Sequence, residues 1–178
     1  MELYDILTSD DVVNSIKENE EYLFNLIPEV KSMVNFDQRH PHHHLDLYNH
    51  TLYALSLSKN DFEIRLALLL HDIGKPLCYE EGIVRHYKNH AFISSILTFD
   101  ILLRLNFGLD FIYKICKLVE LHDISIKREE IDNDLEFILK RYEVQRCDAL
   151  AHHPDKLEKR KQYLKDTKEL IKQKKKRL

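Results

Sequence analysis

A histidine and an aspartate are adjacent at His71-Asp72, directly after the apolar run 66–70. The run is typical of a buried helix, and Gly74 and Pro76 just beyond it are typical of a helix end. Burying an imidazole and a carboxylate is costly unless something pairs with them. A divalent metal ion would pair with both, because both groups bind borderline and hard cations. The doublet therefore predicts a metal site where a core helix ends.

Further candidate ligands lie on other segments with apolar neighbours. His50 falls in the middle of a helical pattern, and Asp148 lies in the small apolar stretch 147–151. Each has an ordinary alternative: a single helical histidine is most often a hydrogen-bonded surface or core residue, and Asp148 could face solvent. His122 beside Asp123 could mark a helix C-terminus, where a histidine favours the dipole. His50, the doublet and Asp148 follow one another along the chain, each on a helical segment with apolar neighbours, and this combination favours a metal site.

This order of residues resembles the signature of the HD superfamily of metal-dependent phosphohydrolases. The stretches 36–52, 68–76, 86–90 and 118–122 are similar, in order and spacing, to the HD domain of bacterial tRNA nucleotidyltransferases (CCA-adding enzymes and poly(A) polymerase relatives). The segment 146–151 resembles the helix that carries the last aspartate, with a cysteine where the family usually has alanine. The resemblance covers roughly residues 35–172 and implies an HD-type helical bundle.

The resemblance also implies roles for single residues. It implies one divalent ion (Mn, Fe, Co, Ni, Mg or Zn) held by His50, His71, Asp72 and Asp148. His90 and His122 match positions that bind a second metal or the phosphate in some relatives, with hydrogen bonding to the substrate or to water as the alternative.

Catalytic and pocket residues follow from the same resemblance. Asp72 is expected to orient or deprotonate the attacking water. Lys75 is expected either to pair with phosphate or to be an ordinary helix-end lysine, and His43 and His86 are expected to line the pocket.

The implied activity is hydrolysis of a phosphomonoester or phosphodiester of a nucleotide or RNA end by a metal-activated water. Cyclic 2′,3′-phosphodiesters and 2′- or 3′-phosphates would be the first substrates to test. Only about 35 residues precede the similar region, too few for a nucleotidyltransferase head, so we expect a stand-alone HD domain that adds no nucleotides to tRNA. The alternative is a non-catalytic HD-type module that binds nucleotide or RNA.

Composition favours an all-α, compact helical bundle, because 3 glycines and 4 prolines are too few for a turn-rich β fold. We expect N-terminal helices packed on the core over 1–34, the HD domain over 35–153 and a basic C-terminal helix over 154–178. Apolar periodicity predicts two helices within 9–36, then helices over 46–57, 62–70, 88–105, 110–121 and 131–151. We expect a loop over 37–45 and a loop or short irregular hairpin over 75–87.

Charge is unevenly placed along the chain. Residues 156–178 carry 11 Lys/Arg and 3 Asp/Glu, a local charge of +8, whereas the whole chain carries −3. This segment predicts either a weak, sequence-independent contact with RNA or a solvated helix face. Leu157, Leu164, Ile171 and Leu178 are seven residues apart, which predicts a narrow stripe packed across another helix.

Other features bear on location. No run of 18 apolar residues predicts a membrane span, and the acidic N-terminus is unlike a signal peptide. Cys78, Cys116 and Cys147 are odd in number and widely spaced, which is typical of reduced thiols in a cytoplasmic protein, with two of them in the core. The sequence leaves the oligomeric state open.

Overall fold

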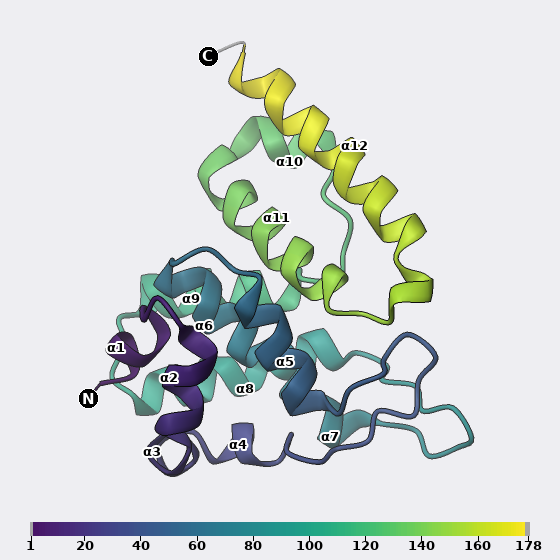
Figure 1. Ribbon diagram of the computed structural model, residues 1–178. Helices are drawn as coiled ribbons and strands as arrows, with labels where there is room; N and C mark the ends of the chain where they lie inside the picture. The colour runs from purple at the N-terminus through teal and green to yellow at the C-terminus, as the bar shows by residue number, and fades with distance from the viewer. Residues whose placement is uncertain (1, 177–178) are drawn as a thin grey trace.

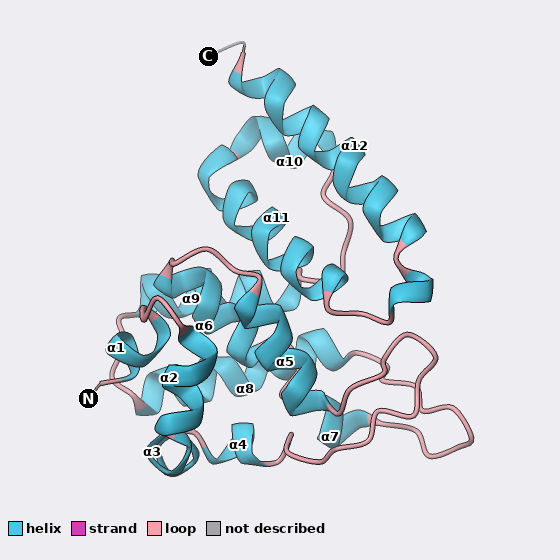
Figure 2. Ribbon diagram, viewed as in Figure 1, coloured by secondary structure: helices cyan, strands magenta, loops and turns pink. Residues whose placement is uncertain are grey.

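The protein is helical throughout the part that the computed structural model describes, residues 2–176, and that part contains no strand (Figures 1 and 2). The all-α prediction is confirmed. A single antiparallel bridge joins Glu80 to His86 in the loop before α8. The helices are α1 (Leu3–Leu7), α2 (Val12–Glu18), α3 (Glu20–Leu26), α4 (Pro28–Lys31), α5 (Leu47–Ser56), α6 (Phe62–Leu70), α7 (Lys75–Cys78), α8 (His90–Arg104), α9 (Leu109–Glu120), α10 (Arg128–Asn133), α11 (Leu135–Leu150) and α12 (Glu158–Lys175).

Aspartates begin three of the long helices. The side chains of Asp46, Asp61 and Asp134 each accept a hydrogen bond from the backbone N–H three residues further on, at 2.9 to 3.0 Å. These bonds satisfy donors that the first turn of a helix leaves free, and they place negative charge at the positive end of the helix dipole. The starts of α5, α6 and α11 are therefore encoded locally.

Helix α6 is the centre of the main core. Its residues 66–70 are fully buried, and α5, α9 and α11 pack on it from different sides. Helix α8 lies along α9, and the N-terminal helices α1 and α2 contact α6 and α5 (Figure 1). Because apolar neighbours surround α6, its sequence is apolar on nearly all faces rather than on one stripe.

Several helix boundaries differ from those predicted. The region 9–36 holds three short helices rather than two, with Pro28 starting α4. The predicted helix over 131–151 is divided, because Asp134 leaves the helical conformation between α10 and α11 and caps the latter. Lys75–Cys78 forms one helical turn instead of a loop. Helix α8 starts at His90 rather than at 88, because Asn89 adopts a left-handed conformation with φ of 60°.

The C-terminal helix α12 packs against α10 and α11 (Figure 1). Leu164 and Ile171 are buried there, as the seven-residue spacing predicted, whereas Leu178 lies outside the described residues. Ile171 joins a small second core with isoleucines of α10, α11 and the preceding loop. The basic helix is thus fixed to the body of the protein along one face.

All three thiols are free, and Cys147 alone is fully buried. Cys116 is half-buried and packs against the main core that contains Cys147, so two thiols contact the core as predicted, and Cys78 is half-buried. Across residues 2–176, every helix is too short or too polar to span a lipid bilayer.

Candidate metal centre

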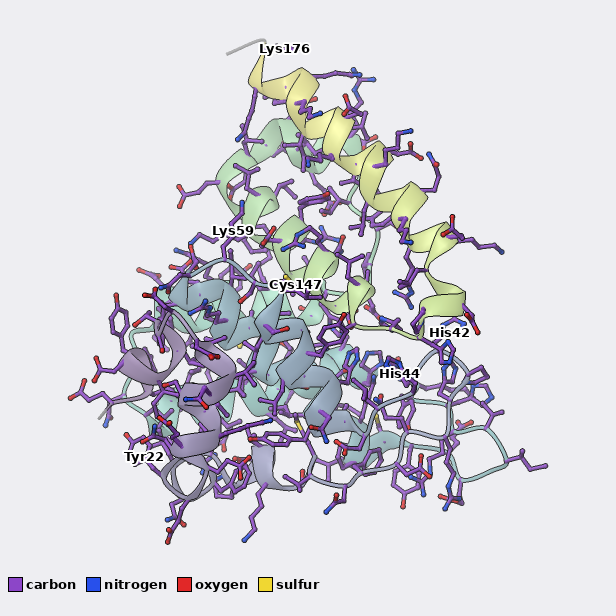
Figure 3. The ribbon with its side chains drawn as sticks, in the orientation of Figure 1. Tyr22, His42, His44, Lys59, Cys147 and Lys176 are labelled. Carbon is purple, nitrogen blue, oxygen red and sulfur yellow. The ribbon has the colours of Figure 1, made fainter. Side chains whose placement is uncertain are left out.

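The site is built where helices end. His71 follows the last residue of α6, His122 follows α9, and His90 opens α8. His50 and Asp148 come from within α5 and near the end of α11. Helix ends leave room for side chains to meet, so five separate elements contribute to one cluster. Figure 3 shows the labelled His42 and His44 on the neighbouring loop, close to the turn between α11 and α12.

The first group of donors surrounds the imidazoles of α5 and α6. The Nε2 atom of His50 lies 3.0 Å from Oδ1 of Asp148. The Nε2 atom of His71 lies 3.2 Å from Oδ2 of Asp72 and 3.6 Å from the same oxygen of Asp148. All four residues are buried. One donor atom each from His50, His71 and Asp72 lies within 4.8 Å of the others, a spacing at which one ion can reach all three.

A second group uses the other oxygen of the same aspartate. Oδ1 of Asp72 lies 3.4 Å from Nε2 of His90 and 3.7 Å from Nε2 of His122. The two Nε2 atoms are 3.3 Å apart. Asp72 therefore faces one imidazole group with each of its oxygens, and these three residues form a second set able to hold a metal ion.

Hydrogen bonds to the main chain orient the imidazoles. Nδ1 of His71, His90 and His122 each bonds the carbonyl oxygen three residues earlier, at 2.7, 3.0 and 2.7 Å. A carbonyl can only accept, so Nδ1 carries the proton. In the neutral ring Nε2 is then unprotonated and directed into the cluster, which is the arrangement of a metal-binding histidine held by its second nitrogen.

A pocket of about 220 Å³ opens onto the cluster. Every predicted site residue except the deeply buried His50 and His71 lines this pocket. The structure therefore brings all the predicted residues together, some as the pocket wall and two behind it.

The donor set fits a divalent metal ion. Nε2 of His71 and Oδ1 of Asp72 are buried and have no hydrogen-bond partner. Orphaned buried polar atoms each cost about 1 to 3 kcal/mol, so native structures seldom keep them without a ligand. An ion in the first group would satisfy Nε2 of His71, and an ion in the second group would satisfy Oδ1 of Asp72 together with the facing Nε2 atoms of His90 and His122. Imidazole nitrogens with carboxylate oxygens are ligands that borderline divalent ions accept.

The family profile described as "HD domain" matches residues 43–174. The chain belongs to the HD domain family. HD domains are typically metal-dependent hydrolases that act on phosphate esters. The cluster of histidines and aspartates in this protein, which could hold a metal ion, agrees with that general activity. The match includes α12, the basic helix. Comparison with curated proteins gives no significant match.

Charges in this HD domain centre are strongly coupled. Burial would lower the pKa of His71, but the carboxylates of Asp72 and Asp148 outweigh it and raise that pKa to about 10 in the absence of a metal, so an ion that binds Nε2 must displace its proton. Burial would raise the pKa of the Asp72 carboxyl, but the charges of His71 and Lys75 hold it well below its ordinary value. Both carboxyl groups of the centre are therefore ionised at neutral pH.

Lys75 is buried beside the doublet rather than free in the pocket. Its Nζ atom lies 2.6 Å from Oδ2 of Asp72 and 3.0 Å from Oε1 of Gln38. The preceding Gly74 is not the left-handed helix terminator that its position suggests, since its φ is −79°. A Cβ there would lie 2.7 Å from the backbone nitrogen of Ser94, so glycine permits close packing of the turn on α8.

His43 and His86 occupy different parts of the pocket wall. The ring of His43 packs 4.9 Å from that of His50 and 4.6 Å from that of His152. Burial lowers the pKa of His43, so its ring is neutral at physiological pH. His86 lies in the bridged loop before α8, because that helix starts only at His90.

The pocket also contains residues that the sequence reasoning missed. His152 is buried and bonds the carbonyl oxygen of Asp148 through Nδ1 at 2.8 Å. Its position four residues after a predicted ligand on a helix was a signal that could have found it. Arg160 lies in the basic segment, which was predicted as a separate helix, and no local pattern distinguishes it from the neighbouring lysines.

Proposed function

We propose that this HD domain is a metal-dependent phosphohydrolase that cleaves a phosphomonoester or phosphodiester of a nucleotide or RNA end. The observation that carries the proposal is the buried pair His71-Asp72: Nε2 of His71 and Oδ1 of Asp72 have no hydrogen-bond partner, and Asp72 lines a pocket of about 220 Å³. The choice of nucleotide or RNA end rests on the sequence resemblance to the HD domain of tRNA nucleotidyltransferases.

In this proposal the donor set would hold the ion or ions. A divalent ion bound there would supply a water of lowered pKa and would neutralise charge on a phosphate oxygen. The first ion would be held by His50, His71, Asp72 and Asp148. A second would be held between Asp72, His90 and His122.

The chain's own residues would then position the reactants. Asp72 is ionised at neutral pH, so its carboxylate can accept a hydrogen bond from the attacking water and align it with phosphorus. His122 is neutral there, since burial and the neighbouring His71 lower its pKa to about 4. His43 and His86 on the wall, and Lys75 beside Asp72, would donate hydrogen bonds to phosphate oxygens.

The test is a substrate panel on purified protein loaded separately with Mn, Co, Ni or Mg. The panel would contain 2′,3′-cyclic nucleotides, nucleoside 2′-, 3′- and 5′-monophosphates, and linear dinucleotides. We expect turnover in at least one combination. An absence of turnover with every metal, together with no metal by elemental analysis, would overturn the proposal.

Variants connect the activity to the site. His71→Ala and Asp72→Ala should lose bound metal and activity together, because each removes a donor from the buried cluster. His44→Ala is the matched control. His44 is a histidine on the loop beside the centre, but its side chain is exposed and lies outside the groups of metal-binding residues. Metal retained at full occupancy in both site variants would show that the ligand assignment is incorrect.

The alternative function is a non-catalytic HD-type module that binds RNA through α12. Its support is the charge of +8 over residues 156–178 and the exposure of Lys161, Lys165 and Lys168 on that helix. Replacing these three lysines by glutamate should remove RNA binding and its salt dependence, while leaving the metal centre intact. RNA binding that survives this change would exclude the helix as the contact.

A further inference from the structure

We propose that Arg160 binds a second, non-reacting phosphate group, so that the substrate carries at least two phosphoryl groups. This inference rests on the proposed phosphohydrolase function and names its substrate class. Arg160 lies near the start of α12 and is half-buried. It would be a specificity-determining residue contributed by the basic helix.

Arg160 lies at the junction of two pockets. It lines the 220 Å³ pocket above Asp72 and also an adjoining pocket of about 210 Å³. The two pockets also share His122, Asp123 and Asp148. The second pocket lacks Asp72 and Lys75, so a group bound there is outside the proposed reacting centre. A molecule that occupies both pockets would lie against the residues that they share, and Arg160 is the only cation among these that is permanently charged.

The guanidinium has no hydrogen bond or ion pair within residues 2–176, unlike the other arginines that are withdrawn from solvent. Arg65 and Arg141 bond backbone carbonyls, and Arg146 bonds Glu143 at 2.7 Å as well as a carbonyl. An arginine carries five donors and stays charged at all accessible pH values. A half-buried arginine that keeps its donors unused on a pocket wall is a binding group for an anion.

The fold holds Arg160 in this place. Leu164, Thr167 and Ile171 on the same helix are buried, so α12 is fixed along its length. The chain just before the helix is tied to the histidine loop, because the backbone N–H of His153 donates to the carbonyl oxygen of His42 at 2.8 Å. The arginine is therefore a fixed part of the pocket wall rather than part of a loose basic tail.

Charge balance selects an anion as the occupant. In the second pocket Arg160 and Lys159 stand against Asp123 and Asp148. Asp148 faces His50 and His71 and would be neutralised by the metal, and the side chain of Asp123 is 46% exposed to solvent. The half-buried Arg160 and the exposed Lys159 are then the excess charge along this pocket. The planar guanidinium matches two oxygens of one phosphate, which a lysine cannot do.

The first test measures binding by calorimetry on metal-loaded protein, with metal content checked before and after each titration. The probes are orthophosphate and methylenediphosphonate, a non-hydrolysable molecule with two phosphonate groups. We expect wild type to bind methylenediphosphonate more tightly. Arg160→Ala should weaken that binding about tenfold to a hundredfold and leave orthophosphate binding nearly unchanged. Arg160→Lys should recover only part of the loss, because it restores charge but not the planar fork.

The control is Lys161→Ala, which removes the neighbouring exposed cation on the same helix and should not change the preference. Equal weakening of both probes by Arg160→Ala would overturn the inference, because the arginine would then bind the attacked phosphate. No weakening of either probe, or no binding of either probe by wild type, would overturn it as well.

The second test is kinetic and separates this inference from the proposed function. With a nucleoside 3′,5′-bisphosphate, Arg160→Ala should raise KM about tenfold or more, while KM for the matching 5′-monophosphate changes little. Turnover of both substrates with unaltered selectivity in the variant would overturn the inference alone. If wild type turned over no phosphate ester, the proposed function would fail, and the binding measurement would still decide the role of Arg160.

Discussion

Two buried polar regions of this protein differ in how their hydrogen bonds are satisfied. Arg141 on α11 is fully buried, and its guanidinium donates to the carbonyl oxygens of Leu121 and Ile124 and to Glu130, at 3.2, 2.6 and 2.7 Å. At the metal centre, by contrast, His71 and Asp72 are equally buried, yet each keeps a polar atom without a hydrogen-bond partner.

The difference distinguishes buried polar groups that stabilise the fold from buried polar groups that are arranged to bind a ligand. A satisfied buried group fixes the chain, whereas an unsatisfied one is costly until a ligand completes it. The two regions are also connected. Arg141 and Gln145 both bond carbonyls of the turn 121–124, which contains His122. Gln145 alone bonds both Leu121 and Ile124, so the turn that carries His122 stays bonded when Arg141 is replaced.

Metal removal is the sharpest test of this contrast. Chelation should lower the free energy of unfolding by about 4 kcal/mol if the free metal had been about a thousand times its Kd, because only the folded state holds the assembled site. Thermal unfolding with and without chelator measures the change. In His71→Ala the chelator should have no effect, and a full response in that variant would remove this residue from the site.

Replacing Arg141 by methionine tests the satisfied region. We expect a loss of about 3 kcal/mol, because the carbonyls of Leu121 and Ile124 each lose one of their two donors and Glu130 loses its buried cation. Urea unfolding should show the same loss for metal-loaded and metal-free protein. The control is Lys140→Met: Lys140 pairs with Asp61 and Glu63 nearer the surface, so the cost should be about 1 kcal/mol or less. A loss in Arg141→Met that depended on metal would contradict the separation.

Gly74→Ala tests how closely the turn after the doublet must pack. The added methyl would lie 2.7 Å from the backbone nitrogen of Ser94 and 2.9 Å from its Oγ. Relief requires the turn to move away from α8, which should cost about 1 to 3 kcal/mol and weaken metal binding. Gly108→Ala is the matched control, since a Cβ there meets nothing within 4 Å. Unchanged stability in Gly74→Ala would refute the packing role.

The smallest expected effect concerns a buried thiol that needs no ligand. Burial raises the pKa of Cys147 to about 12, so almost none of it is thiolate at pH 8. Raising the pH toward 9.5 should speed alkylation of half-buried Cys78 and leave Cys147 unmodified in the folded protein. Mass spectrometry after iodoacetamide treatment checks this. Modification of Cys147 before unfolding would show that α11 opens beside Asp148.

Much of the fold could be predicted from the sequence, because helices depend on local patterns. The capping aspartates and the apolar periodicity define α5, α6 and α9 to within a residue or two. The errors in the predicted helix boundaries occur where the backbone leaves the helical conformation at a single residue. Asn89 starts α8 late, and Asp134 divides a predicted helix.

For the site, the sequence by itself determined which residue types were available and where helices would present them. His71-Asp72 after an apolar helix was sufficient to predict a buried, metal-binding doublet. The tertiary structure decided which oxygen of Asp72 faces which imidazole, that Lys75 is already paired, and that Arg160 borders the pocket. Local sequence determines helix ends, but the distances between side chains on different helices depend on how those helices pack.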